Sequence, residues 1–273
     1  LILNGPSAML TDIGVNLSSS RFAGDIEPVL VRAQESNVTK IILTGTSINE
    51  TEVVIELCET YKTQFPSMLY ATAGIHPHEA KSFNTDAITA LEDLAKHPSV
   101  VAIGETGLDF NRNLSPHKTQ EKVFESQIEL AITCTLPLFL HERDASKRQL
   151  EILRSYQNHL PKAVIHCFTG DKKTLFSYLD LDLYIGITGW ICDERRGHDL
   201  QNIVKNIPLN RLMVETDAPY LLPRNMPQMP KSRRNEPANL SYVIEGIAAH
   251  RAESATTIAE NSSATAVAFF NLT

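Results

Sequence analysis

The sequence is poor in cysteine, has no excess of positive charge and lacks a long apolar run. Its four cysteines, among 273 residues, are scattered and form no CxxC pair, which argues against a disulfide framework and against a cysteine-based zinc site. Twenty-five Lys and Arg against 32 Asp and Glu give a net charge of −7, so no overall positive field can hold long nucleic acids. A substrate that carries phosphate would have to be bound locally.

Signals for export or membrane insertion are also missing. No stretch approaches the roughly 18 apolar residues of a membrane-spanning helix, and residues 1–10 lack the cationic start and apolar region of a signal peptide. We therefore expect a cytoplasmic protein without membrane association, and a monomer as the default. Residues 1–8 show no pattern, and we interpret them as an N-terminal extension, natural or added, ahead of a single domain at 9–273.

The sequence does contain a regular alternation of short β-branched apolar runs with longer stretches of helical periodicity. The runs predict eight strands, at Thr11–Val15, Lys40–Thr44, Leu69–Gly74, Val100–Gly104, Leu136–Leu140, Ala163–His166, Leu183–Ile187 and Leu212–Glu215. Helical patterns lie between them at Ser47–Thr63, Asp86–His97, Lys118–Thr133, Ala145–Tyr156 and Lys172–Tyr178. Eight such units in a chain of this length are typical of a (β/α)8 TIM barrel of the α/β class. A doubly wound open sheet would give the same alternation.

Two later segments extend this pattern. The proline-rich stretch Pro219–Pro237 follows the eighth predicted strand, which indicates a loop over the barrel mouth, where such barrels build their active sites. Apolar residues within Ser254–Phe270 predict a closing helix that packs on the outside of the barrel.

The positions of the polar residues favour the barrel over the open sheet. Four strands end in a residue that can bind a metal, namely Glu105, His141, His166 and Asp217. The C-terminal ends of parallel strands meet on one face of a barrel, so we expect these side chains to converge. Two imidazoles and two carboxylates suit Mg²⁺, Mn²⁺ or Zn²⁺. A single histidine at a strand end is more often structural, and it is the repetition in four units that favours a metal site.

Six motifs occur along the chain in an order and spacing compatible with a barrel: GIHPH at 74–78, GETGLDF at 104–110, HERDA at 141–145, HCFTG at 166–170, ETDAPYLLP at 215–223 and RRNEPA at 233–238. In these motifs the chain, from about Met9 to its C-terminus, resembles the TatD-type metal-dependent deoxyribonucleases, a TIM-barrel branch of the amidohydrolase-like superfamily. The resemblance implies that Glu105, His141, His166 and Asp217 stand at the metal-ligand positions.

The first strand departs from the Asp-x-His-x-His pattern of that family. Gly14 and Asn16 stand where the two histidines would be. Glycine offers no ligand atom, and an amide oxygen suits Mg²⁺ better than Zn²⁺, which weighs against the usual two-metal site. The DIGVNL opening and the segment GITGWICDERRG within 185–197 are similar to a branch of Mg²⁺-dependent 3′-to-5′ exonucleases of single-stranded DNA and RNA. The resemblance implies that activity, in DNA repair or nucleic-acid turnover.

Phosphodiester hydrolysis needs a nucleophilic water, stabilisation of charge on the non-bridging oxygens and help for the departing oxygen. We assign Glu105, His141 and His166 as metal ligands, and Asp217 as a ligand or as the base that deprotonates the water. Glu215, two residues before Asp217, is expected to support a ligand histidine or to be a buried structural carboxylate.

Further candidates follow the third and later strands. His76 is expected either to touch the scissile phosphate or protonate the leaving oxygen, or to be structural, whereas His78 is expected to pack behind it. Asp109 is expected to hydrogen-bond His76 or to cap the following turn. Strand alternation predicts that Cys167 points away from the metal, into helix packing.

Three arginines, Arg143, Arg233 and Arg234, are candidates for contacts with backbone phosphates, with a solvated surface charge as the alternative for each. Trp190 and Phe110 follow strand ends and are candidates for stacking on bases. Core packing is the alternative for both aromatic residues, and we favour it for Phe110.

Two other functions remain open at this point. A hydrolase of a small amide or ester would use the same barrel, but the carboxylated lysine typical of that chemistry is absent, because Glu105 stands at its position after the fourth strand. A binding protein with a purely structural metal would explain the missing first-strand histidines. It would not require the other motifs.

Overall fold

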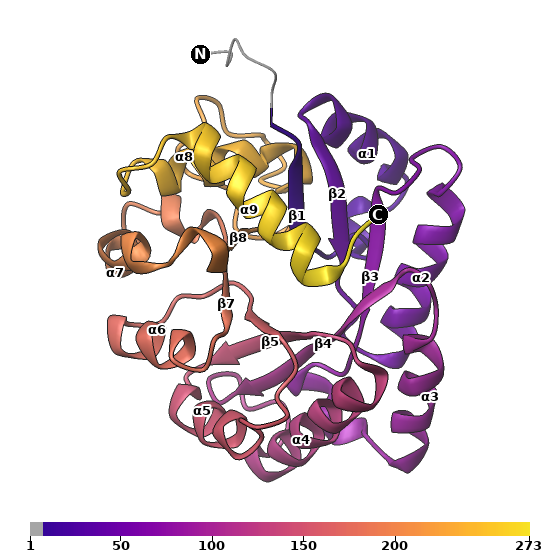
Figure 1. The fold of residues 1–273 in the computed structure, drawn as a ribbon. Helices are drawn as coiled ribbons and strands as arrows, with labels where there is room; N and C mark the ends of the chain where they lie inside the picture. The colour runs from indigo at the N-terminus through magenta and orange to yellow at the C-terminus, as the bar shows by residue number, and fades with distance from the viewer. Residues whose placement is uncertain (1–7) are drawn as a thin grey trace.

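The computed structural model describes residues 8–273 and contains eight parallel strands (Figure 1). They are β1 Leu10–Val15, β2 Val38–Leu43, β3 Leu69–Ala73, β4 Val100–Asp109, β5 Leu138–Arg143, β6 Ala163–Ile165, β7 Tyr184–Ile187 and β8 Leu212–Val214. Each strand pairs with the next one along the chain, in the order β1 to β8. The predicted TIM-barrel architecture is confirmed.

Hydrogen bonds beyond the end of β8 join the two edges of the sheet. The backbone N–H of Asn16 donates to the carbonyl of Ala218 at 2.8 Å, and the N–H of Asp217 donates to the carbonyl of Gly14 at 2.9 Å. Val15 and Ala218 form a parallel bridge. This closure brings the chain after β8 directly against the chain after β1, at the face where the C-terminal strand ends meet.

Nine α-helices surround the strands within residues 8–273 (Figure 1). They are α1 Ile26–Glu35, α2 Ile48–Tyr61, α3 Thr85–Ala95, α4 His117–Cys134, α5 Ser146–Ser155, α6 Lys172–Leu179, α7 His198–Ile203, α8 Leu240–Ala248 and α9 Ala255–Phe270. Short 3-10 segments are η1 Ser20–Phe22, η2 Pro77–Ser82, η3 Gly189–Cys192, η4 Val204–Asn206, η5 Leu209–Arg211 and η6 Pro237–Asn239. Side-chain caps fix several starts: Ser47, Asn84 and Ser254 each accept a hydrogen bond from a backbone N–H three residues later.

The predicted strands begin within two residues of the observed ones, but β4 and β5 end later than predicted. β4 continues past Gly104 to Asp109, and β5 continues past Leu140 to Arg143, because Gly107 pairs with His141 and Asp109 with Arg143. Glu105 and His141 therefore lie within strands rather than after them. This long pair of strands forms one wall of the barrel mouth.

A cluster of buried apolar side chains fills the barrel interior. Its members from the strands are Ile13, Ile42, Tyr70, Val101, Ala102, Phe139, Val164 and Met213. Ala266, Phe269 and Phe270 of α9 and Leu272 belong to the same cluster, so the end of α9 packs against the interior at the N-terminal ends of the strands (Figure 1). The prediction that this helix packs on the outside of the barrel is wrong for its last turn.

Thr273 is held at this same end of the barrel. Lys40 Nζ donates to the backbone carbonyl of Thr273 at 2.6 Å, and the Tyr70 hydroxyl donates to it at 2.9 Å. Lys40 and Tyr70 lie in the first half of β2 and β3, far from the C-terminal strand ends.

The segment Pro219–Pro237 contains no helix or strand until η6 begins at Pro237, which confirms the predicted loop. It packs beside η3, since a Cβ on Gly189 would overlap the carbonyl oxygen of Leu221. The predicted N-terminal extension lies outside the described residues except for Ala8. Within the described part of the chain, no helix combines the length and apolar character that crossing a membrane requires.

Candidate active site at the barrel mouth

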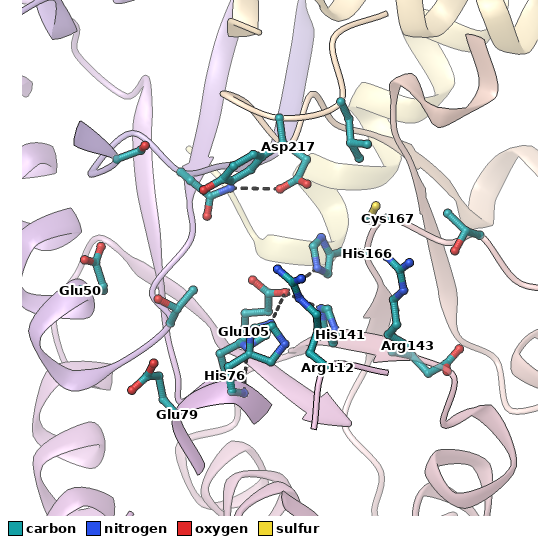
Figure 2. Close-up of a pocket in the computed structure, with 18 of the residues that line it drawn as sticks. Glu50, His76, Glu79, Glu105, Arg112, His141, Arg143, His166, Cys167 and Asp217 are labelled. Atoms are coloured by element: carbon teal, nitrogen blue, oxygen red, sulfur yellow. Dashed lines mark hydrogen bonds and ion pairs between the residues drawn. The ribbon is translucent and has the colours of Figure 1, made fainter. Parts of the chain in front are cut away.

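The main cavity of the barrel mouth has a volume of about 620 Å³ (Figure 2). It is lined by side chains from the C-terminal ends of the strands and from the loops that follow, including His76, Glu105, His141, His166 and Asp217. All four predicted metal ligands therefore line one cavity. These residues are far apart in the sequence but lie together because the parallel strands end on the same face of the barrel, as predicted.

Glu105 lies at the centre of a cluster of histidines (Figure 2). Its Oε1 is 2.7 Å from Nε2 of His166, 2.9 Å from Nδ1 of His141 and 3.4 Å from Nε2 of His76. The Glu105 side chain is 8% exposed. A buried carboxylate is costly unless it is paired, and three imidazoles converge on this one.

The charges of this cluster depend on one another. Burial alone would raise the pKa of Glu105, but His166, His76 and His141 hold it well below its usual value. Burial would lower the pKa of His166, but the carboxylates of Glu105 and Glu215 raise it well above the usual value. Glu105 is thus a buried anion, and a protonated imidazole or a bound cation would stabilise it.

His76 occupies the turn that follows β3. Its Nδ1 accepts a hydrogen bond from the backbone N–H of His78 at 3.1 Å, which leaves Nε2 directed at Glu105. Burial lowers the pKa of His76, although Glu105 opposes the shift. Because Nδ1 accepts here, the neutral ring carries its proton on Nε2, which can donate to Glu105, and binding a metal through Nε2 would require that proton to move to Nδ1.

His76, Glu105 and His141 offer ligand atoms that all lie within 4.8 Å of one another. Nε2 of His141 is buried and makes no well-formed hydrogen bond, with Asp109 Oδ2 3.4 Å away. Two imidazoles and a carboxylate at this separation fit a divalent cation by their donor chemistry. The compact donor group thus contains His76, for which the sequence leaves open a contact with the phosphate, protonation of the leaving oxygen or a structural role.

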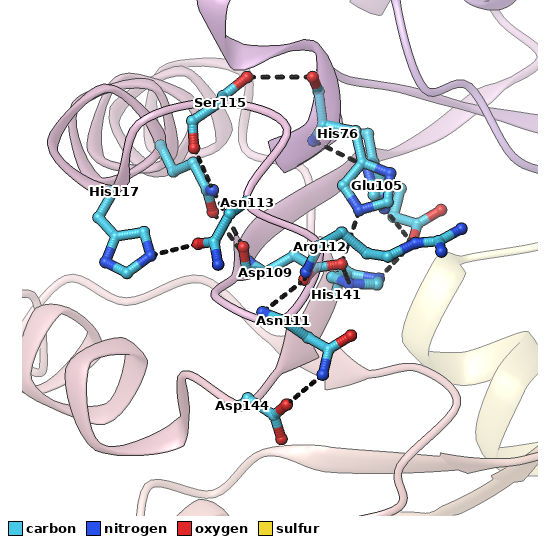
Figure 3. A network of polar contacts seen from close by, with 12 residues as sticks. His76, Glu105, Asp109, Asn111, Arg112, Asn113, Ser115, His117, His141 and Asp144 are labelled. Carbon is cyan, nitrogen blue, oxygen red and sulfur yellow. Dashed lines mark hydrogen bonds and ion pairs between the residues drawn. The ribbon is translucent and has the colours of Figure 1, made fainter.

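Asp109 supports this group from behind (Figure 3). Its Oδ2 lies 2.6 Å from Nε2 of His78, and its Oδ1 accepts from the backbone N–H groups of Asn111 and Arg112 at 3.0 and 2.8 Å. Burial would raise the pKa of Asp109, but the contacts with His141, Arg112 and His78 lower it. Asp109 caps the turn, as one of the two expectations had it, and its histidine partners are His78 and His141 rather than His76.

Glu215 fills the space beside the first strand. It is fully buried, accepts from the backbone N–H of Cys167 at 2.5 Å, and has Oε2 3.3 Å from Nδ1 of His166. Glu215 thus contacts His166, the histidine that it would support if His166 is a metal ligand. A Cβ on Gly14 would overlap Oε2 of Glu215 and lie 3.4 Å from Cζ of Phe139. Position 14 therefore has no room for a side chain in this structure, so a histidine could not replace Gly14 unless Glu215 moved.

Asp217 lies across the cavity from Glu105 (Figure 2). Asn16 Nδ2 donates to its Oδ1 at 3.0 Å, which ties the chain after β8 to the chain after β1. Burial raises the pKa of Asp217 to about 7, with Glu215 and Glu105 adding to the shift and His166 and Asn16 opposing it. Asp217 therefore stands apart from the compact donor group, with a pKa suited to a general base near neutral pH.

Cys167 lines the cavity, so the prediction that it points away from the site is wrong. Strand β6 ends at Ile165, and Cys167 has a φ of 47°, in the left-handed region, where strand alternation no longer applies. Burial raises the pKa of its thiol, which disfavours the reactive thiolate form.

The predicted phosphate-binding arginines separate into two groups. Arg143 is exposed and lines the cavity, whereas the guanidinium of Arg234 hydrogen-bonds Asp25 and Glu236 and lies 4.9 Å from the ring centroid of Phe22. Arg234 is therefore committed to the packing of its loop. Arg233 is exposed and lines a smaller groove next to the cavity.

The aromatic candidates occupy different environments. Trp190 lines the cavity and has the guanidinium of Arg196 4.5 Å from its ring centroid. Phe110 packs against the core and stacks on His117 with ring centroids 3.7 Å apart, which agrees with the packing interpretation. Tyr220, which is 52% exposed, also lines the cavity and is not indicated by the sequence.

The sequence also gives no direct indication of Arg112 or of a set of buried glutamines. Arg112 lines the cavity from the loop after β4 (Figures 2 and 3). Gln127 of α4 accepts from the backbone N–H of Ile75 at 2.8 Å and donates to its carbonyl at 3.0 Å. Gln120 binds both backbone groups of Asp109 in the same way. Polar residues seven apart on the apolar face of a predicted helix are the signal that could have indicated the glutamines.

The comparison with protein families matches residues 11–271 to the model of the TatD-related DNases. A protein from Edwardsiella piscicida named a 3′-5′ ssDNA/RNA exonuclease is 47% identical over 246 residues, covering 90% of this chain and 93% of that protein. A protein of the same name from Pectobacterium parmentieri is 46% identical over 261 residues, covering 96% and 99%. These matches confirm the resemblance found in the six motifs.

Solved structures give the same result for the fold. A TatD homologue from Escherichia coli has a TM-score of 0.87 at 27% identity, over 97% of this chain and 99% of that one. A TatD-family hydrolase from Entamoeba histolytica has a TM-score of 0.88 at 26% identity, over 96% and 98%. A guanine deaminase from C. acetobutylicum, at 10% identity and a TM-score of 0.60, shares the fold alone.

Proposed function

The chain belongs to the family of TatD-related DNases, and from this membership we propose that it is a metal-dependent 3′-to-5′ exonuclease of single-stranded DNA, and of RNA. The observation that carries the proposal is the convergence of His76, His141 and His166 on the buried carboxylate of Glu105 at the barrel mouth. Residues 9–273 act as one nuclease domain in this proposal.

The cation in this proposal is held by Glu105 together with the surrounding histidines. His76 and His141 complete the compact donor group, and His166, which shares Oε1 of Glu105, is the further ligand expected from the sequence. A bound divalent cation supplies a water of lowered pKa and neutralises charge on the phosphate oxygens. We propose Mg²⁺ as the physiological ion, for which Glu105 offers an oxygen ligand and Asp217 a second one in its alternative role; the imidazoles also suit Mn²⁺ and Zn²⁺.

Asp217 is the proposed general base. It lies across the cavity from Glu105, and Asn16 fixes one of its carboxylate oxygens. The other oxygen can orient a water and take its proton, and a pKa of about 7 keeps a large fraction of the carboxylate ionised at neutral pH. Asp217 therefore acts as a base, with metal ligation as the second role that the sequence leaves open.

The substrate's phosphate is held by cations on the same wall of the cavity. Arg112 and Arg143 are exposed side chains that line it from the ends of β4 and β5 (Figure 2). A guanidinium binds two phosphate oxygens at once and so can orient the phosphodiester for in-line attack. With Nδ1 accepting from the N–H of His78, the neutral ring of His76 carries its proton on Nε2 and can donate it to the leaving oxygen, whereas holding the cation through Nε2 requires the Nδ1–H tautomer and the loss of this hydrogen bond.

The test follows a 5′-labelled single-stranded oligonucleotide and its duplex with Mg²⁺, Mn²⁺ or Zn²⁺. The proposal expects a ladder that shortens from the 3′ end, weaker on the duplex, and abolished by EDTA and in Asp217→Asn. The variant Glu129→Gln, on the outer surface of α4, is the matched control and should keep full activity. An intact oligonucleotide with all three ions would refute the proposal, and a ladder shortening from the 5′ end would refute the polarity.

A cytoplasmic location, a monomeric state and a role in DNA repair or nucleic-acid turnover remain predictions from the sequence. Fractionation and light scattering test the first two directly.

A further inference from the structure

A groove of about 230 Å³ lies beside the catalytic cavity and is lined by an unusual number of arginines. They are Arg195 and Arg196 after η3, and Arg224 and Arg233 in the loop Pro219–Pro237. The nearby carboxylates, Asp193 and Glu194, leave this surface with a net charge of +2 on a chain whose net charge is −7. We call this surface the arginine groove.

The arginine groove is continuous with the catalytic cavity. Trp190 and Leu221 line both spaces, so these two side chains form a shared boundary. The guanidinium of Arg196 lies 4.5 Å from the ring centroid of Trp190, on the boundary itself. A chain that leaves the cavity across Trp190 would therefore meet Arg196 first.

The guanidinium groups are held in place by the protein. Asp193, 5% exposed, accepts from Nε and Nη2 of Arg195 at 3.2 and 3.1 Å, and from Nε and Nη2 of Arg196 at 3.1 and 2.9 Å. Glu194 accepts from Nε and Nη2 of Arg224 at 2.7 and 2.5 Å. Fixed guanidinium groups lose less side-chain entropy when they bind a ligand.

The remaining edge of each guanidinium is available. Among residues 8–273, no hydrogen bond uses Nη1 of Arg195, Arg196 or Arg224, and Arg233 forms no ion pair. The side chains of Arg195 and Arg196 are 58% and 57% exposed. The four arginines exceed the two carboxylates that they can pair with. The excess positive charge lies along the groove, which a cluster of surface ion pairs alone would not explain.

We propose that the arginine groove binds the phosphate backbone of the single strand beyond the nucleotide in the catalytic cavity, on the 5′ side of the bond that is cut. This proposal rests on the proposed function, because the polarity places the remaining strand outside the cavity. Regularly spaced phosphates are the ligand that several fixed guanidinium groups match best. The groove would thus set the affinity for longer substrates and not the chemistry.

The test compares a single strand of about twelve nucleotides with a dinucleotide, using the variant Arg196→Gln/Arg224→Gln/Arg233→Gln. Arg195 is kept as the partner of Asp193, so that the buried carboxylate stays paired. We expect KM for the long strand to rise by about tenfold or more, with kcat and both constants for the dinucleotide within about twofold. The salt dependence of log KM should weaken by about 0.7 for each phosphate that the variant no longer binds.

Arg211→Gln is the matched control. Arg211 pairs with Asp182 through Nε and Nη2, and its guanidinium lies 4.6 Å from the ring centroid of Tyr184. Arg196 makes the same two kinds of contact with Asp193 and Trp190. Arg211, however, directly precedes β8, at the other end of the barrel. This variant should leave KM for the long strand unchanged. For the triple variant, an equal increase in KM for both substrate lengths would overturn the proposal that the groove binds the strand. No increase in KM for the long strand would also overturn it.

A binding measurement separates this proposal from the nuclease activity. Fluorescence anisotropy of the long strand in EDTA needs no cleavage, and the triple variant should bind it about tenfold more weakly than the wild type and Arg211→Gln. Unchanged binding overturns the groove even if the protein cuts DNA. Weakened binding supports it even if no cleavage occurs, which would be a failure of the proposed function alone.

Discussion

Glu105 is the residue through which the cation site can be tested apart from catalysis. Replacement by glutamine keeps its size but removes the buried charge on which three imidazoles converge. We expect Glu105→Gln to weaken Mn²⁺ binding by about 100-fold, measured by isothermal titration calorimetry, because a ligand is removed as well as a charge. Glu79→Gln, an exposed residue of the cavity rim, should bind Mn²⁺ as the wild type does. Equal affinity in both variants would contradict the site.

Gly14 is a second residue whose role is measurable. Because a Cβ there would overlap the carboxylate of Glu215, Gly14→Ala should lower the free energy of unfolding by about 1–3 kcal/mol in urea denaturation. The cost should be smaller when Glu215 is replaced by alanine, since the space is then empty. A double-mutant cycle tests this coupling, and strictly additive effects would show that the two positions do not compete for the same volume.

At the scale of elements, buried glutamines connect the outer helices to the strands that hold the site. Gln127 of α4 binds both backbone groups of Ile75, directly before His76, and donates to Thr106 Oγ1 at 2.7 Å. Gln127→Ala should lower the free energy of unfolding by about 2–3 kcal/mol, since buried backbone groups lose their partners. Mn²⁺ affinity should fall as well, because His76 loses its support. Gln157→Ala, at an exposed position, serves as the control for both measurements.

The segment after η3 should be sensitive to acid. Arg195 and Arg196 hold the pKa of Asp193 well below its usual value of about 3.8. A lowered carboxylate pKa gives stability that is complete above the unfolded-state pKa, declines as the pH falls below it and is lost as the pH falls through the folded-state pKa. Asp193→Asn should therefore lower Tm at pH 7, and its difference from the wild type should shrink below about pH 4. Asp182→Asn, at an exposed ion pair, should change Tm little at either pH.

The fold could be predicted because its periodicities are local. Eight short apolar runs and the helices between them set the barrel, and strand ends in a barrel converge without further information. The late ends of β4 and β5 escaped prediction because the strands are prolonged by pairing with each other, through polar residues such as Thr106 and Glu142.

The site could be predicted in its members but not in its arrangement. Glu105, His141 and His166 are indicated by strand ends, whereas the place of His76 depends on how the turn into η2 directs its imidazole at Glu105. The left-handed backbone of Cys167 reverses a prediction from strand alternation. Backbone conformation at strand ends is set by tertiary contacts, which a single sequence does not display.

At the scale of the whole molecule, the cation should stabilise the fold without being needed for it. The donor group lies at the mouth, whereas the interior cluster from Ile13 to Leu272 and the packing of α9 involve none of its residues. EDTA should leave the circular dichroism spectrum unchanged. A Mn²⁺ concentration about 100-fold above Kd should add about 2.7 kcal/mol and raise Tm in differential scanning fluorimetry.

Glu105→Gln provides the control for this stabilisation. Its Tm should not respond to Mn²⁺ concentrations that raise the Tm of the wild type. Unfolding of the protein in EDTA would mean that the fold depends on the ion. A wild-type Tm that does not change with Mn²⁺ would contradict the proposed cation site.

The hydrogen bonds from Lys40 and Tyr70 to the carbonyl of Thr273 bear on how the protein can be attached to a surface. The carbonyl that they hold lies at the end of the barrel opposite the catalytic cavity, beside the last turn of α9. A linker joined after Thr273 would leave from that end, so a protein immobilised by it on a bead or sensor chip would present its mouth to the solution. Coupling through lysines would offer no such orientation, since Lys231 lies in the loop at the mouth.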